Sequence, residues 1–403
     1  IFLFGIRPAW KAARLQPMEI LGQGTQRTPN KLISSLTSKL PPGIGLGLRS
    51  TFRKPARLLV TLLALSLAMV ILGGTMMFIS GFTGAFNEAV DEQENWEYQI
   101  ATYPSNVDNI TQWAENNTVS FELTLTTQAT LYDSNNVLTL KGYDVVSQSD
   151  DAMHRLNLLE GKLPVQGKAI PEVILDEGSA ELKSYSVGDT LIIDFEGVQH
   201  ELEIVGIARE LTRSVHFHRV DLTPIVDVEA NGALVVLSED GNIEDIRFST
   251  ISIIEKEAMV ESFTELIDQQ KSAMQAVYVL GGLMAIAILF NTLLINLSER
   301  DAELATLRVL GASRTRLAVI LTVEHTFIGL VGGLAGALAS IAYYAAMSNA
   351  FSTWAFHIPV IINTAVFLQI IGFVLVAALL TTPVGILRIG RMNLLEVVAR
   401  HER

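Results

Sequence analysis

Four long stretches without a charged side chain constrain this chain more than any other feature of its 403 residues. A helix of roughly 20 mostly apolar residues crosses the hydrocarbon core of a bilayer, which is about 30 Å thick, and each stretch exceeds that length. The sequence therefore predicts a membrane protein with four transmembrane helices and excludes most soluble enzymes. The predicted spans, built on these stretches, are residues 58–86, 272–297, 316–347 and 358–387.

Basic residues gather beside these spans and predict their orientation. An excess of Lys and Arg in short loops marks the cytoplasmic side of a membrane. Three basic clusters lie before the first span, between the second and third, and after the fourth, so an even number of crossings separates them. Both termini are therefore predicted to be cytoplasmic in a multi-pass protein of the cell membrane. The clusters are Arg49, Arg53, Lys54 and Arg57; Arg300, Arg308, Arg314 and Arg316; and Arg388, Arg391, Arg400 and Arg403.

The polar block at 87–271 is predicted to be an extracytoplasmic domain of mixed α/β fold, inserted between the first two spans. It contains 35 acidic and 11 basic residues, a net charge of −24, whereas the rest of the chain has 18 basic and 7 acidic residues, a net charge of +11. A nucleic-acid-binding protein needs a basic patch, so no nucleic acid is expected as a partner. The chain has no cysteine, which excludes disulfides and thiolate metal sites.

Alternating and β-branched segments predict eight strands in this domain, with turns at 133–136 and 196–197. Helices are expected at 107–115, 179–183 and 255–270, and the last continues without a breaker into the second span. The first span is likewise expected to continue toward Gln93. Two such helices would form a stalk between the domain and the bilayer. The predicted strands are 98–102, 119–125, 137–141, 172–175, 190–195, 201–208, 234–237 and 249–254.

The two ends of the chain share a short pattern. Residues 11–21 and 388–398 align with matched basic, acidic and aliphatic positions, and internal repeats of this kind indicate duplication. Coincidence between two amphipathic segments beside a membrane is the alternative. The predicted segments outside the spans are the tail of an earlier copy at 1–21, a cytoplasmic linker at 22–45, an interfacial helix at 46–57 whose cations meet anionic lipid headgroups, and a cytoplasmic tail at 388–403.

No catalytic motif is recognisable, and no cofactor is expected. The chain lacks a G-x-x-x-x-G-K-[ST] loop, so it does not bind ATP through a P-loop, and it lacks G-x-S-x-G and H-E-x-x-H. His216 and His218 would place two imidazoles on one face of a strand, as a metal site requires. Because no third ligand is evident, an exposed loop or strand pair is favoured there, and no metal site is predicted.

The segment between the second and third spans, residues 298–315, is predicted to be a short amphipathic helix on the cytoplasmic membrane surface. Leu304, Leu307 and Leu310 recur at three-residue steps and form an apolar stripe,. Acidic residues at its start and Gly311 at its end fit the dipole and C-cap rules. Such a helix is well shaped to dock a soluble partner. A charged loop that only satisfies the positive-inside rule is the alternative.

The same segment carries a resemblance to a known family. Its pattern S-E-R-x-x-E-L-A-x-L-R-x-L-G-A-S, from Ser298 to Ser313, together with Glu324 in the next helix, resembles the signature of FtsX-like permeases of the ABC transporter superfamily. Residues 47–59 resemble the entry helix of that family. The segments that resemble the extracytoplasmic domain shared with MacB-type exporters are 160–164, 172–175, 187–191 and 204–207.

The resemblance implies a permease subunit that hydrolyses nothing itself and works with a separate ABC ATPase subunit, which would bind ATP and Mg²⁺. The resemblance covers about residues 45–400 and suits the repeat, because each half of a duplicated member of the family has four such helices and an extracytoplasmic domain. Residues 45–403 would then be the second half of a duplicated permease, in contact with the other half. The segment at 298–311 would be the coupling helix seated on the ATPase. Its implied polar contacts are Glu299, Arg300, Glu303 and Arg308, its packing residues are Leu304 and Leu307, and its end is Gly311.

Two features of the third span require an explanation. A bare charge on Glu324 within the bilayer would cost roughly 2.5–3.5 kcal/mol, so a structural polar contact near the coupling helix is favoured over a proton relay. The second feature is a stripe of glycines, and small residues let helices approach closely. Packing against helices of the same chain is favoured over packing against a second copy in a homodimer. The small residues are Gly329, Gly332, Gly333 and Gly336.

The expected function is that of an ABC permease subunit. ATP hydrolysis by the partner would move the extracytoplasmic domain, which would export or extract a hydrophobic or amphipathic substrate such as a lipoprotein, lipid or peptide. One alternative is an FtsX-like regulator that moves no cargo and instead switches an extracytoplasmic hydrolase or sensor. Another is a membrane-anchored sensor without an ATPase. The sequence identifies neither the substrate nor the extracytoplasmic partner.

Overall fold

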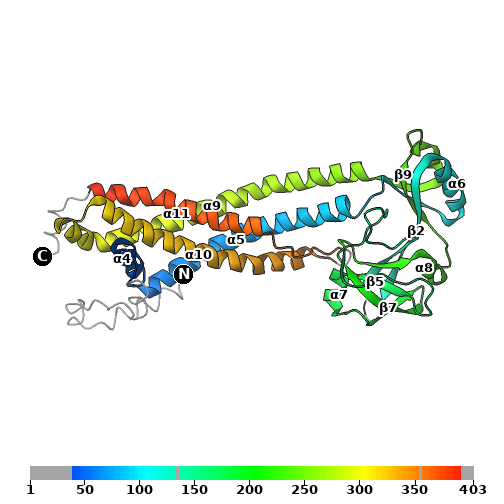
Figure 1. The fold of residues 1–403 in the computed structure, drawn as a ribbon, viewed down its shortest axis with the longest axis horizontal. Helices are drawn as coiled ribbons and strands as arrows, with labels where there is room; N and C mark the ends of the chain where they lie inside the picture. Colours follow the sequence, from blue (N-terminus) through cyan, green and yellow to red (C-terminus); the bar gives the residue numbers. More distant parts are fainter. Residues whose placement is uncertain (1–38, 133, 135, 354–355, 392–403) are drawn as a thin grey trace. The chain divides into compact units, whose positions relative to one another are not determined.

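The structure is a computed structural model that describes residues 39–132, 134, 136–353 and 356–391 (Figure 1). The predicted repeat tail at 1–21, most of the predicted linker and the end of the predicted C-terminal tail lie outside the described residues. The described residues fall into two compact units. One unit contains residues 39–65, 285–333 and 373–391, and the other contains residues 66–284 and 334–372.

Four of the described helices are long and apolar enough to cross a membrane. Pro55 is the first residue of the first one, a position that suits proline because the N–H it lacks would have no partner there,. A shorter helix, α4 (Pro42–Thr51), precedes it. The four long helices are α5 (Pro55–Asn87), α9 (Lys256–Val309), α10 (Arg314–Phe351) and α11 (Thr364–Arg391).

The fourth long helix begins later than the sequence predicted. Residue 358 was expected to open it, but α11 starts at Thr364. Pro359 lies in the irregular segment before it, and the side chain of Asn363 accepts a hydrogen bond of 2.9 Å from the backbone N–H of Ala365. An asparagine that pairs with a first-turn N–H defines a helix N-terminus, which explains the later start.

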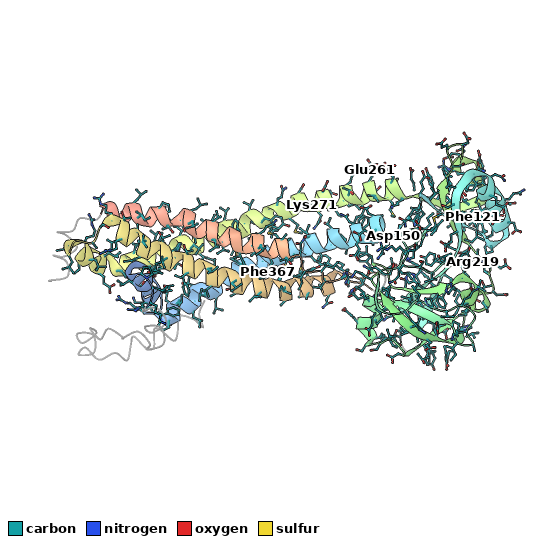
Figure 2. The ribbon with its side chains drawn as sticks, viewed as in Figure 1. Phe121, Asp150, Arg219, Glu261, Lys271 and Phe367 are labelled. Carbon is teal, nitrogen blue, oxygen red and sulfur yellow. The ribbon has the colours of Figure 1, made fainter. Side chains whose placement is uncertain are left out.

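The second span and the segment at 298–315 are not separate elements. Helix α9 continues unbroken for 54 residues to Val309, so the expected coupling helix is its final part (Figure 1). Charged side chains such as Glu261 and Lys271 occupy its first part (Figure 2). Helix α5 in turn ends at Asn87 and is followed by a π-helical turn, Glu88–Glu92, close to the predicted extension toward Gln93.

Residues 88–255, here called the inserted domain, form a mixed sheet with short helices. The strand order is β10-β1-β9-β2-β3-β8-β5-β7-β4, and β6 pairs with β2 and β7. The pairs β3–β8 and β5–β7 are parallel, and the other pairs are antiparallel. The strands are β1 (Tyr98–Thr102), β2 (Thr118–Leu131), β3 (Val137–Tyr143), β4 (Leu158–Gly161), β5 (Glu172–Asp176), β6 (Thr190–Phe195), β7 (Val198–Ala208), β8 (Ser214–His218), β9 (Gly232–Leu237) and β10 (Thr250–Glu255).

All eight predicted strands are present, but β4, β8 and the helix after β8 were not predicted. Strand β8 was missed because its two histidines suggested an exposed segment, whereas His216 is buried. The helices are α6 (Val107–Asn117), α7 (Glu177–Lys183) and α8 (Arg219–Val226), with 3₁₀ turns at Pro104–Asn106 and Ile243–Ser249.

The chain enters and leaves the inserted domain on neighbouring strands. Strand β1 follows α5 and its π-helical turn, and β10 leads directly into α9. These two strands pair antiparallel, with Tyr98 opposite Glu255. The two helices therefore connect to adjacent strands of one sheet.

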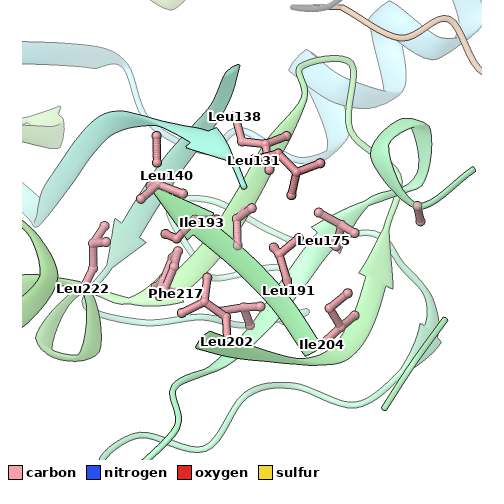
Figure 3. Close-up of a cluster of buried hydrophobic side chains, with 14 of the residues drawn as sticks. Leu131, Leu138, Leu140, Leu175, Leu191, Ile193, Leu202, Ile204, Phe217 and Leu222 are labelled. Carbon is pink, nitrogen blue, oxygen red and sulfur yellow. The ribbon is translucent and has the colours of Figure 1, made fainter. Parts of the chain in front are cut away.

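The core of the inserted domain packs around the β6–β7 hairpin. Glu196 and Gly197 at its tip have φ values of 53° and 85°, the left-handed pair that a two-residue hairpin turn requires. Each buried aliphatic side chain contributes roughly 1.5–3 kcal/mol. Buried members shown in Figure 3 include Leu140, Leu175, Leu191, Ile193, Leu202, Ile204, Phe217 and Leu222.

Asp176 is a buried carboxylate at the start of α7. Its oxygens accept hydrogen bonds from the backbone N–H groups of Ser179 (2.8 Å) and Ser214 (3.0 Å). Burial nevertheless raises the pKa of this carboxyl from 3.8 to about 6, against the opposing effect of these hydrogen bonds and of Arg213. The folded chain thus binds this proton more tightly than the unfolded chain. The stabilisation that results is complete below pH 4 and is lost as the pH rises through 6.

The variant Asp176→Asn is therefore expected to gain stability relative to the wild type as the pH rises from 4 to 7. A shift of one pKa unit corresponds to 1.36 kcal/mol, so the relative gain is about 2–3 kcal/mol. Melting temperatures of the two proteins in detergent, measured at several pH values, check this. The exposed Asp240 supplies a control, because Asp240→Asn should follow the wild type. If the melting temperatures of Asp176→Asn and the wild type change in the same way with pH, the pKa of Asp176 is not raised as described.

Candidate coupling site

The reversal between α9 and α10 has a defined geometry. Gly311 has a φ of +96°, which glycine adopts without strain. The N–H of Ala312 donates to the carbonyl of Leu307 (2.9 Å), and the N–H of Gly311 donates to that of Arg308 (3.0 Å). This hydrogen-bond pair is the Schellman motif that ends a helix at glycine. The turn, residues 310–313, is therefore a specified structure.

The apolar stripe at the end of α9 faces the chain's own helices. Leu304, expected to pack against a partner, is fully buried, and Leu307 packs at the edge of the same cluster. Leu304 is therefore unavailable to a partner. The exposed apolar side chains here are Val309 (66% exposed) and Leu310 (78%). The other buried members of the cluster are Leu293, Leu297, Leu317, Ile320 and Leu321.

The two glutamates expected to contact an ATPase are paired within the chain. Glu299 accepts from Lys54 (2.6 Å) and from Arg57. Glu303 accepts two hydrogen bonds from Arg53, at 2.6 and 2.8 Å. Exposed ion pairs contribute only about 0–1 kcal/mol each, so their main effect is to set the position of the turn between α4 and α5 against α9.

Glu324 lies at the centre of a polar network that joins three helices. Its carboxylate accepts from Arg300 of α9 (2.7 Å), Ser50 of α4 (2.8 Å) and Asn296 of α9 (3.3 Å). The carboxylate and the guanidinium are both largely buried. A buried charge is tolerated when it is paired and hydrogen-bonded, which explains how an acidic residue is accommodated in the third span.

The four glycines of α10 divide between two neighbouring helices. A Cβ added at Gly332 would lie 2.7 Å from Leu65 of α5, and one at Gly336 would meet the next turn of that helix. A Cβ added at Gly329 or Gly333 would lie 3.1 Å from α11 side chains, Ala378 and Val374 respectively. The glycines therefore allow close packing of α10 on both sides within the chain.

The two histidines of β8 have different surroundings. His218 is half-buried, and its Nε2 lies 3.1 Å from the carbonyl of Pro164. His216 is buried beside His154 and Glu210, two residues that the sequence gave no reason to group with it. Burial lowers the pKa of His216 to about 3. Burial also opposes the protonation of His154, but the carboxylates of Glu94 and Glu210 outweigh it and raise its pKa to about 10.

These features define a polytopic membrane protein with an α/β domain inserted after its first span and a capped turn between its second and third. Residues 276–394, which hold the last three spans and that turn, match the model of the FtsX-like permease C-terminal domain. The chain therefore carries an FtsX-like permease C-terminal domain at residues 276–394.

Three solved structures share partial similarity with the chain. The periplasmic region of MacB from Actinobacillus actinomycetemcomitans is 14% identical, with 44% of this chain and 96% of that one covered and a TM-score of 0.31. The extracellular domain of the noncanonic ABC-type transporter YknZ from Gram-positive bacteria is 13% identical, with 38% and 88% covered and a TM-score of 0.28. A domain of a putative permease protein from Porphyromonas gingivalis is 13% identical, with 37% and 67% covered and a TM-score of 0.25. No match is found among curated proteins.

Proposed function

We propose that a partner ABC ATPase docks on the α9–α10 turn and moves the inserted domain, which exports or extracts a hydrophobic or amphipathic substrate such as a lipid, lipoprotein or peptide. The observation that carries the proposal is the unbroken course of α9. It runs for 54 residues from the end of β10 to Val309, about 80 Å at 1.5 Å per residue. Because hydrogen bonds along a helix resist stretching, a displacement of the turn reaches the edge strand of the sheet.

Charge supports the orientation that this mechanism needs. Arg308, Arg314 and Arg316 surround the α9–α10 turn, and basic residues in short loops mark the cytoplasmic side, where an ABC ATPase works. The inserted domain, which is strongly acidic, then lies outside the membrane, and both chain ends lie inside. Membrane lipids would surround the four spans, which lie on α5, α9, α10 and α11.

The surface proposed for the ATPase differs from the one expected from the sequence. Val309 and Leu310 project from the turn, with the exposed Arg314 and Arg316 beside them. A matching partner surface would have an apolar groove with acidic side chains at its rim. Glu299, Arg300 and Glu303 would act indirectly, because they hold the turn in place through their contacts with α4 and its neighbours.

Replacement of Leu310 by arginine is expected to weaken ATPase docking without unfolding the permease, because the side chain is exposed and adds no buried charge. A tagged permease that contains the whole natural chain would be co-expressed with the ABC ATPase encoded beside it. We expect at least a tenfold lower yield of co-purified ATPase, corresponding to about 1.4 kcal/mol.

Leu40→Arg is the matched control, because Leu40 is also an exposed leucine outside the spans and its replacement should leave the yield unchanged. An unaltered yield in Leu310→Arg, or an equal loss in the control, would refute docking at the turn. If no ATPase co-purifies with the wild type, the transporter assignment itself fails.

A further inference from the structure

A buried cluster of side chains that can bind a metal ion lies within the inserted domain. His154 lies in the segment between β3 and β4, Glu210 between β7 and β8, and His216 on β8. Their side chains are 2%, 6% and 0% exposed. One ligand atom from each lies within 4.8 Å of the other two. Three different segments of the domain therefore converge on one point.

Three atoms of this cluster have no hydrogen-bond partner among the described residues: Nε2 of His154, Oε1 of Glu210 and Nδ1 of His216. The opposite ring nitrogens are both occupied. His154 Nδ1 lies 2.9 Å from Glu94 Oε1, and His216 Nε2 lies 3.0 Å from the hydroxyl of Ser214. Each imidazole therefore has one partnered nitrogen and one that is unpartnered within the cluster.

The partners identify which nitrogen carries the hydrogen. Ser214 donates its own hydroxyl proton to the carbonyl of Thr212 (3.1 Å), so toward His216 it acts as an acceptor, and Nε2 of His216 donates. A carboxylate only accepts, so Nδ1 of His154 donates to Glu94. Without a metal, the carboxylates of Glu94 and Glu210 favour a second proton on His154. A metal ion that displaces this proton leaves one hydrogen on each ring, and the free nitrogens then present lone pairs. Three lone pairs then converge in a buried space, which is unfavourable unless a cation occupies it.

A proton satisfies this arrangement poorly. Nε2 of His154 and Oε1 of Glu210 are 3.6 Å apart, which exceeds the usual N–H···O distance. A proton between them would also leave Nδ1 of His216 without a partner. Lys141 forms an ion pair with Oε2 of Glu210, at 3.9 Å, but Oε1 of Glu210 and the two ring nitrogens have no hydrogen-bond donor among the described residues.

We propose that His154, Glu210 and His216 bind a zinc ion. Two imidazole nitrogens and one carboxylate oxygen are a ligand set that Zn²⁺ accepts, with a water molecule in the fourth position. Ligand atoms around a tetrahedral zinc are roughly 3.3–3.5 Å apart, given metal–ligand bonds of about 2.0–2.1 Å. The 3.6 Å separation of His154 Nε2 and Glu210 Oε1 is close to that value, and the His216 ligand atom lies within 4.8 Å of both.

The surroundings match those of a bound metal. Glu94 orients the ring of His154 in the way that carboxylates commonly orient metal-ligating histidines,. The ring of Tyr143 stacks on that of His154, with the ring centroids 4.6 Å apart. The backbone carbonyl of Glu94 also accepts a hydrogen bond from Lys256, the first residue of α9. The metal would therefore stabilise the domain at the point where both connecting helices meet it. This role is independent of the proposed transport function.

The test measures zinc in the full chain, purified in detergent from cells grown with added ZnCl₂ and washed with a chelator of moderate affinity. We expect one zinc per chain by elemental analysis in the wild type. Glu210→Gln and His216→Gln, which preserve side-chain polarity, should lose it. His218→Gln is the matched control, because His218 lies two residues away on the same strand and should retain the wild-type content.

Cobalt allows the site to be tested in the wild-type chain, so the result does not depend on whether the variants fold. Wild-type chain loaded with Co²⁺ in place of zinc should show the intense visible absorption of a four-coordinate site. Glu94→Gln should bind the metal with 10–100-fold lower affinity, as removal of such an orienting carboxylate does elsewhere. Wild-type chain that takes up neither metal would overturn the proposal. So would zinc content that persists in Glu210→Gln or that falls equally in His218→Gln.

Discussion

Replacing Arg300 with methionine should destabilise the folded chain by about 3–5 kcal/mol, the effect seen when one partner of a buried ion pair is removed. The reason is that Glu324 remains buried and loses its only cationic partner among the described residues. Ser50 and Asn296 still donate to the carboxylate, but neither neutralises its charge. Unfolding of the purified chain in mixed micelles, followed as a function of denaturing detergent, measures the change.

Two further variants separate the charge from the shape of the side chain. The double variant Arg300→Met with Glu324→Gln should recover most of the lost stability, because no unpaired charge remains. Arg316→Met should change stability by less than about 0.5 kcal/mol, since Arg316 is exposed,. If the double variant is as unstable as Arg300→Met, the loss comes from packing rather than from the isolated carboxylate, and this account of the network is wrong.

Replacing Gly336 with leucine should destabilise the helix bundle by about 3 kcal/mol or more, at the upper end of the cost of overpacking. Even a single Cβ at this position would lie 3.0 Å from the backbone oxygen of Ser66 and closer still to the Cβ of Met69. Backbone atoms cannot move aside as a flexible side chain can, so α5 and α10 would have to separate. Thermal unfolding in detergent measures the effect.

Gly372 supplies the matched control within α11. A Cβ added there meets no atom of the described residues within 4 Å, so Gly372→Leu should be neutral or slightly stabilising, because glycine is a poor helix former. Equal effects at the two positions would mean that the contact between α5 and α10 at Gly336 does not contribute as described.

The four spans and the inserted domain could be predicted because their signals are local. Apolar runs longer than about 20 residues are typical of membrane-spanning helices and uncommon in soluble domains. A short run of aliphatic and β-branched residues beside a turn identifies strands such as Thr190–Phe195 without knowledge of their neighbours,. The position of Glu324 within an apolar run also indicated that its charge needed a polar partner. Which residue supplies that partner was not evident.

What could not be predicted depends on contacts between distant parts of the sequence. The charged residues at 299–303 suggested a break after the second span, yet good helix formers such as glutamate and arginine allow α9 to continue,. Leu304 has the same local pattern whether it faces a partner or the chain's own cluster. His154 and His216 are 62 positions apart in the sequence, and parallel pairing of β3 with β8 is not encoded in any short motif.

The antiparallel pairing of β1 with β10 has an evolutionary consequence. Strand β1, which follows α5, pairs with β10, which leads into α9, and Tyr98 lies opposite Glu255. The segment between these two strands therefore begins and ends at neighbouring positions of the sheet. Domains whose ends lie close together tolerate insertion into other proteins. Residues 103–249 could therefore be enlarged, trimmed or exchanged while β1 and β10 stay paired and continue into the same two helices.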